Sequence, residues 1–201
     1  MNTAPSEPQH PRHLQHRAAD DLRFIRATME RAVSFTAVPG WGNVAIAVTA
    51  LAAAALAARQ PTEARWLLVW LGEAALAALI AMASIALKAR RLRVPLLRGS
   101  GVRFLFGLGP PFFAAALLTF VLYRAGLFDL LPGLWLLLYG AGVVTAGAYS
   151  VRVVPAMGLC FMALGTAALV ILIEATDTVM AIGFGGLHLV FGAVIAWKHG
   201  G

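Results

Sequence analysis

Two ionisable residues, Glu73 and His188, stand inside long apolar stretches of the chain. A charge in hydrocarbon is costly, so such residues usually face the interior of a helix bundle and serve a function. The residues on the helical face of Glu73 are small or polar: Ala77, Ala81 and Ser84. This face favours packing inward and a carboxyl group that binds a proton or a cation. The alternative is a neutral structural carboxyl group bonded to a neighbouring helix.

His188 lies near the middle of the last apolar stretch. Ala181, Gly185 and Gly192 share its helical face, so a neighbouring backbone can approach the imidazole closely. If both helices enter from the same side, Glu73 and His188 differ in depth by only about 5 Å. The spacing predicts a Glu73–His188 pair that relays protons or binds a ligand. A simple hydrogen bond between helices is the alternative for the histidine.

Two glycine-rich motifs interrupt the apolar stretches, Gly107-Leu108-Gly109-Pro110-Pro111 and Gly183-Phe184-Gly185-Gly186. Proline removes a backbone donor, so we expect the helix at the first motif to be kinked or broken. Interrupted helices at matched places in two halves of a chain indicate a transporter site, because the freed backbone groups need partners. A kink without a ligand is the alternative.

Six apolar stretches must position these residues, and each is close to the roughly 20 residues that cross about 30 Å of hydrocarbon. The chain of 201 residues is 60% hydrophobic and 12% charged, far from the balance of soluble domains. We therefore predict an all-α integral membrane protein with six transmembrane helices. The predicted spans are Trp41–Ala58, Trp66–Leu87, Phe104–Tyr123, Leu131–Tyr149, Val154–Ile173 and Thr178–Trp197.

Positive charge predicts the orientation. Of the 16 lysines and arginines, three lie on one side of the predicted spans, Arg59, Arg65 and Arg124. The others lie on the side of the amino-terminal region and of the loop after the second span, which carries Lys88, Arg90, Arg91, Arg93, Arg98 and Arg103. Because positive segments stay inside, we expect both termini in the cytoplasm and the chain in the cell inner membrane.

The net charge of +7 indicates contact with anionic lipid at the cytoplasmic face and not with nucleic acid, since the charges lie at the ends of apolar stretches. Four tryptophans also lie at the ends of spans and predict an interfacial aromatic belt. They are Trp41, Trp66, Trp135 and Trp197.

An internal repeat is a further prediction. A shift of 93 residues aligns Val38-Pro39-Gly40 with Leu131-Pro132-Gly133, and Gly72–Ile80 with Gly165–Ile173. Beyond a gap, the two glycine-rich motifs align as well. Three helices per half would give an inverted 3+3 repeat, a recurrent plan of transporters, with halves at 37–124 and 131–201. Chance matches among abundant Ala, Leu and Gly are the alternative.

Three regions follow from composition. Residues 1–18 are predicted to be a disordered cytoplasmic arm, residues 19–36 an amphipathic surface helix, and residues 37–201 the transmembrane domain. The single cysteine, Cys160, forms no cluster, and no nucleotide or protease motif occurs, so we expect no cofactor, no metal and no enzyme.

Two functions fit these features. The first is a transporter or channel for a small solute or ion, linked to protons through Glu73 and His188. The second is a non-catalytic partner subunit for membrane assembly or regulation. The small size of the bundle favours a homodimer or a partner membrane protein beside it.

Overall fold

The computed structural model describes residues 20–23, 38–92, 100–173 and 175–199. The chain forms two compact units, Met1–Val33 and Ser34–Gly201. In the first unit residues 20–23 are helical, and Arg23 Nη1 donates to Asp20 Oδ1 over 3.3 Å on an exposed surface. The predicted arm (1–18) and most of the predicted surface helix (19–36) lie outside the described residues.

The second unit contains six helical spans that are long and apolar enough to cross a membrane. Together with the absence of strands among the described residues, they confirm the prediction of an all-helical, six-span chain. The spans are α2 (Gly40–Ala57), α3 (Glu63–Leu92), α4 (Ser100–Ala125), the 3₁₀ helix η1 (Phe128–Leu130) with α5 (Leu131–Gly147), α6 (Val153–Val170), and a last span made of α7 (Thr176–Met180), η2 (Ala181–Leu187) and α8 (His188–His199).

α3 is longer than predicted. Lys88, Arg90 and Arg91 belong to its last turns and not to a loop, because Ala, Leu, Lys and Arg all favour a helix and charge alone does not end one. Its 30 residues extend over about 45 Å, more than the hydrocarbon thickness. The buried Lys88 Nζ donates to the carbonyl oxygens of Val38 at 3.0 Å and of His199 at 3.1 Å. The lysine thus links α3 to the start of α2 and the end of α8.

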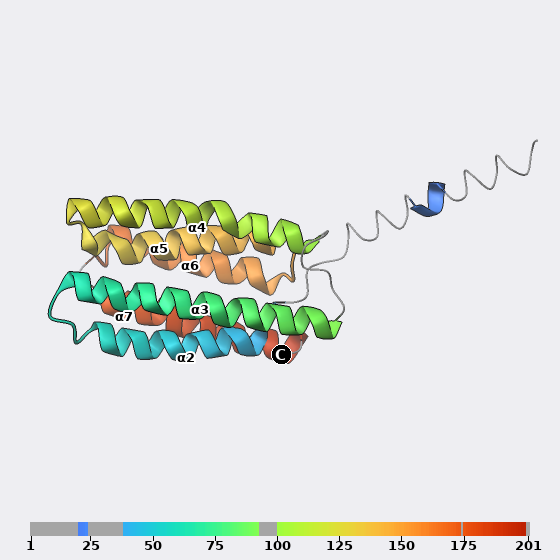
Figure 1. Cartoon of the computed structure of the whole chain (residues 1–201), viewed down its shortest axis with the longest axis horizontal. Coiled ribbons are helices and arrows are strands. Elements are labelled where there is room, and N and C mark those ends of the chain that lie inside the picture. Colours follow the sequence, from blue (N-terminus) through green and yellow to red (C-terminus); the bar gives the residue numbers. More distant parts are fainter. Residues whose placement is uncertain (1–19, 24–37, 93–99, 174, 200–201) are drawn as a thin grey trace, which may run out of the picture. The chain divides into compact units, whose positions relative to one another are not determined.

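The six spans pack as two groups (Figure 1). α2 packs against α3 and against the last span, whereas α5 packs against α4 and α6. α6 and α5 also contact the last span, which joins the groups. α3 packs extensively only with α2 among the described helices. The two outer helices α3 and α4 therefore have different neighbours.

Glycines bring α5 and α6 into backbone contact. A Cβ atom placed on Gly140 would lie 2.6 Å from the carbonyl oxygen of Gly158, and one on Gly158 would lie 2.7 Å from Val144 N. Gly133 faces Leu169, and Gly165 faces Leu137, in the same seam. In lipid, the hydrophobic effect does not drive helices together. Small residues stabilise the helix pair instead, because they permit such close approach.

The last span approaches α2 in the same manner. A Cβ atom on Gly192 would lie 2.9 Å from Val44 N, and Gly185 packs against Leu51. In the other group, Gly107 of α4 packs against the backbone of α5. A Cβ atom placed on Gly107 would lie 2.7 Å from Ala146 N. Each group of spans thus contains a pair of antiparallel helices in close contact.

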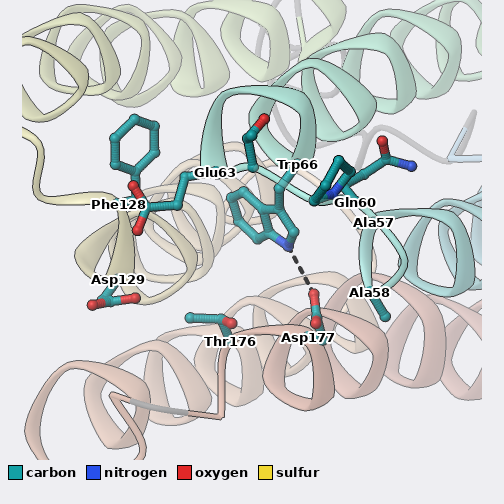
Figure 2. A pocket seen from close by; sticks show the side chains of 11 residues that line it. Ala57, Ala58, Gln60, Glu63, Trp66, Phe128, Asp129, Thr176 and Asp177 are labelled. Atoms are coloured by element: carbon teal, nitrogen blue, oxygen red, sulfur yellow. Dashed lines mark hydrogen bonds between the residues drawn. The ribbon is translucent and has the colours of Figure 1, made fainter.

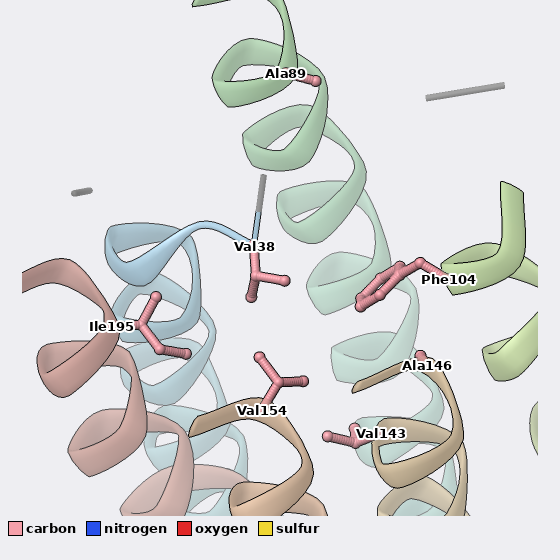
Figure 3. Close-up of a cluster of buried hydrophobic side chains, with 7 residues drawn as sticks. All are labelled: Val38, Ala89, Phe104, Val143, Ala146, Val154 and Ile195. Carbon is pink, nitrogen blue, oxygen red and sulfur yellow. The ribbon is translucent and has the colours of Figure 1, made fainter. Parts of the chain in front are cut away.

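All six spans meet at the end of the bundle that holds Lys88. Figure 3 shows a cluster of buried apolar side chains there, contributed by Val38 just before α2 and by the other five spans. Its members are Val38, Ala89, Phe104, Val143, Ala146, Val154 and Ile195. This end of the bundle is closed by apolar packing.

The two glycine-rich motifs have different structures. α4 is not broken at Pro110 and Pro111 but continues through both. At the second motif the chain forms a π-helix, η2, in place of an α-helix. A π-helix widens the turn by one residue and frequently occurs at functional sites. The predicted interruption is therefore present in the last span only, as a wide turn.

The glycine seam gives a first prediction. Gly158→Ala places a methyl group against the α5 backbone and should lower the thermal stability of the detergent-purified protein, with a cost of about 1–3 kcal/mol. Gly72→Ala is the matched control, because no atom lies within 4 Å of a Cβ at Gly72. Melting curves that coincide for the two variants would contradict the close contact between α5 and α6.

Candidate functional site

A cavity of about 430 Å³ lies inside the bundle and is lined by residues of every span. This volume falls within the range of about 300–1,000 Å³ that is typical of small-molecule sites. Its walls are mostly apolar, and the polar exceptions include Glu73, His188, Tyr139 and Thr119. The two ionisable residues that the sequence singled out therefore line one cavity.

Glu73 is 8% exposed and lies on the α3 face that the sequence predicted to point inward. Ala77 and Ala81 of the same face line the cavity, and Ser84 meets Gly42 of α2. The Oε1 atom of Glu73 lies 2.8 Å from Thr49 Oγ1 on α2. Thr49 Oγ1 also lies 3.0 Å from the carbonyl oxygen of Ile46. The carboxyl group is thus both at the cavity wall and bonded to a hydroxyl.

His188 is 1% exposed and has a partner at each ring nitrogen. Nδ1 lies 2.9 Å from the carbonyl oxygen of Phe184, and Nε2 lies 2.7 Å from the hydroxyl oxygen of Tyr139. A carbonyl oxygen only accepts, so Nδ1 carries the hydrogen. In the neutral imidazole, Nε2 then accepts from the Tyr139 hydroxyl. Both nitrogens are satisfied in this tautomer.

Aromatic rings surround the histidine. The ring centroid of Phe161 lies 5.1 Å from that of His188 in an edge-on arrangement, and Tyr139 lies at 5.3 Å. Tyr139 also packs edge-on against Phe161 at 4.7 Å. Such a fully buried aromatic setting favours the neutral imidazole, because a charge there would lose its hydration.

The π-helix positions this histidine. His188 directly follows η2, and the carbonyl group that its Nδ1 reaches, that of Phe184, belongs to the π-helix. Phe184 also contacts the ring of Trp70 at a tilt and the ring of Tyr139 edge-on, near the cavity. The wide turn therefore determines both the place of His188 and one of its two hydrogen bonds.

Glu73 and His188 do not hydrogen-bond to each other among the described residues. Each is bonded to a residue of another helix that the sequence analysis did not single out, Thr49 and Tyr139. The pair therefore stays a prediction, with both side chains on the wall of the same cavity. Thr49 and Tyr139 are polar groups in the middle of apolar spans, which was the signal available in the sequence.

Of the predicted glycines, Gly107, Gly183 and Gly185 have close packing contacts, whereas no atom lies within 4 Å of a Cβ placed on Gly109. Gly107, Gly109 and Pro110 do not line the cavity. Gly183 packs against Leu136, Gly185 against Leu51, and Gly186 has its nearest neighbour, the carbonyl oxygen of Ala181, at 4.0 Å. Their role in ligand binding stays a prediction.

A second hollow of about 260 Å³ lies at the opposite end of the bundle from Lys88 (Figure 2). The indole N–H of Trp66 points toward Asp177 and donates to its Oδ1 atom over 2.7 Å. Glu63 and Asp129 also line the hollow. No group of three His, Cys, Asp or Glu residues in the described part of the chain could hold a metal ion.

Tryptophans separate this hollow from the central cavity. Trp66 stacks on Trp135 of α5 with ring centroids 6.0 Å apart, and Trp135 Nε1 donates to Thr119 Oγ1 of α4. These two tryptophans are half-buried, whereas Trp41 and Trp197 are exposed, and the interfacial belt stays a prediction. The rings of Trp66 and Trp135 find partners inside the bundle because facing helices bring aromatic and hydroxyl groups together.

No family model, curated protein or solved structure matches this chain.

The Tyr139–His188 bond gives a second prediction. Tyr139→Phe removes the hydroxyl group that bonds to Nε2 and leaves a buried acceptor unpaired, which costs about 1–3 kcal/mol. We expect a lower melting temperature in detergent. Tyr149→Phe is the control, because Tyr149 is exposed and its ring contact with Arg103 does not need the hydroxyl group. An equal effect of both substitutions would show that the buried bond contributes nothing.

Proposed function

We propose that this multi-pass membrane protein is a proton-linked transporter of a small solute, which binds in the central cavity. The observation that carries the proposal is that Glu73 and His188, both deep in apolar spans, line one cavity of about 430 Å³. Ionisable residues inside a membrane protein that face a cavity commonly mark a substrate or proton pathway.

The Glu73–Thr49 contact suits both protonation states of the carboxyl group. When Glu73 is ionised, the Thr49 hydroxyl donates to Oε1. When Glu73 is protonated, its own O–H can donate to Thr49 Oγ1, and the Thr49 hydroxyl then turns to the carbonyl oxygen of Ile46. A proton can therefore be gained or lost while the carboxyl group keeps its partner.

His188 has a different role in this proposal. With both ring nitrogens satisfied, it is a fixed polar part of the wall and not the residue that exchanges the proton. Its hydrogen bond to Tyr139 connects the last span with α5 across the cavity. Solute selectivity is its proposed contribution, because buried and fully bonded polar groups hold a unique geometry.

An inverted repeat is part of the proposal, and two helix contacts support it. The shift of 93 residues maps α2 onto α5, and the glycine-rich motifs map α4 onto the last span. When both shifts are applied, the contact between Gly107 and Ala146 falls in the same antiparallel register as the contact between Gly185 and Leu51. Two equivalent halves would let transport proceed by a rocking motion around the cavity.

The second helices of the halves do not share that register. Gly165 packs against Leu137, whereas the aligned Gly72 has no neighbouring atom within 4 Å. The repeat thus rests on the first and third helices of each half, α2 with α5 and α4 with the last span. The sequence match between Gly72–Ile80 and Gly165–Ile173 gives it no structural support.

The orientation is also part of the proposal. The protein lies in the inner membrane with both termini in the cytoplasm, and its basic face contacts anionic lipid. A fluorescent protein fused after Gly201 should then fluoresce, and a cysteine at Ala64 in a Cys160→Ala background should react with an impermeant maleimide from outside. Labelling of Ala64→Cys only after the membrane is opened would reverse the proposed topology.

Transport is tested in inside-out membrane vesicles with an imposed pH gradient and a pH-sensitive dye. A panel of amines, amino acids and sugars is added one at a time. We expect at least one solute class to dissipate the gradient through the wild-type protein. Glu73→Gln keeps the size and hydrogen bonding of the side chain but cannot carry the proton, so flux should fall by about tenfold or more.

Glu63→Gln is the matched control, because Glu63 is an exposed carboxyl group at the start of the same helix. Unchanged flux in Glu73→Gln would remove the proton-linked role. If no solute in the panel moved protons through the wild-type protein, the alternative of a non-catalytic membrane partner, as a homodimer or with another protein, would be favoured.

A further inference from the structure

The central cavity is closed toward both ends of the bundle. At one end, the cluster of Figure 3 forms the floor, and Val38, Phe104 and Ile195 of that cluster line the cavity. At the other end, a second buried cluster that contains Trp70 and Met180 forms the roof. Apolar packing thus separates the cavity from the two aqueous sides.

The side wall between α3 and α4 is the weakly packed part. α3 packs extensively with α2 alone among the described helices, and α4 packs with α5. Small side chains from both outer helices line the cavity along this wall. They are Ala74, Ala77, Ala78 and Ala81 of α3 and Ala115 and Ala116 of α4. Alanines leave space where larger residues would close the wall.

In a bilayer, this wall faces the acyl chains of lipids. The outward faces of both helices carry large apolar residues such as Leu79, Phe113 and Phe120, which suit hydrocarbon. A molecule that passes between α3 and α4 therefore comes from lipid and must itself be apolar over most of its surface.

The charge of the cavity wall selects the sign of such a molecule. Glu73 is the one carboxyl group among the described residues that line the cavity, and no lysine or arginine lines it. The nearby Lys88 of α3 directs its ammonium group to the carbonyl oxygens of Val38 and His199 instead. An ionised carboxylate in an apolar cavity is stabilised by an opposite charge.

We propose that the cavity binds a lipophilic cation, an apolar molecule with one positive charge, which enters from the bilayer between α3 and α4. This inference deepens the proposed function, because it names the solute class for the same cavity. The cation pairs with the ionised Glu73, and the Thr49 hydroxyl remains its second partner. Binding therefore competes with protonation of the same carboxyl group.

The test compares two ions of the same shape and opposite charge, tetraphenylphosphonium and tetraphenylborate. Binding to the full-length protein in lipid nanodiscs is measured by equilibrium dialysis, and partition into protein-free nanodiscs is subtracted. We expect saturable binding of the phosphonium at least about tenfold tighter than that of the borate. Glu73→Gln should abolish the difference. Equal binding of the two ions, or tighter binding of the borate, would overturn the inference.

The path through the side wall is tested by filling it. Ala77→Phe should reduce the rate and the extent of phosphonium binding, whereas Ala75→Phe should not, because Ala75 is exposed and does not line the cavity. Ala116→Phe fills the same wall from α4 and replaces Ala77→Phe if that variant does not elute as a single species. Unaltered binding in the folded wall variant would refute access between α3 and α4.

The two proposals can fail separately. Phosphonium binding that depends on Glu73 without any proton flux supports the cation site and rejects transport. Proton-linked flux that depends on Glu73, with no phosphonium binding, retains transport and rejects the lipophilic cation as the solute class.

Discussion

The arrangement of this bundle depends on backbone-to-backbone contact at glycines. In lipid, apolar side chains gain little by leaving one apolar surrounding for another, so close packing must hold the helices together. Gly140 and Gly158 provide it between α5 and α6, and Gly192 provides it between α2 and the last span. Because α3 and α4 have alanines and not such a seam between them, space remains there for the cavity.

Glu73 and His188 are also held by contacts within the protein, whereas the buried indole nitrogen of Trp70 has no hydrogen-bond partner among the described residues. Hydrocarbon offers no water, so a buried polar atom is stabilised by a partner within the protein. Glu73 uses Thr49, and His188 uses Tyr139 and the Phe184 carbonyl group. These bonds join α3 to α2 and the last span to α5. The carboxyl group retains freedom to change its protonation, whereas the imidazole is held on both sides.

Much of the fold was readable in the sequence because hydropathy and length alone decide which segments can span a bilayer. The inward face of Glu73 was readable as well, from Ala77 and Ala81 one and two turns away. The pairing of Thr49 with Glu73 and of Tyr139 with His188 was not readable, since it depends on how distant helices meet. Nor did composition distinguish the two glycine-rich motifs: α4 accommodates Pro110 as a continuous helix, whereas the last span widens into a π-helix.

The position of Lys88 has a consequence for the connectivity of the bundle. One nitrogen lies within 3.1 Å of a carbonyl oxygen that precedes the first span and of another at the end of the sixth. The path of the chain through the membrane region is therefore almost a closed ring, in which the sixth span adjoins the first. A short linker could join residues 38 and 199, and the chain between them could then begin in another loop.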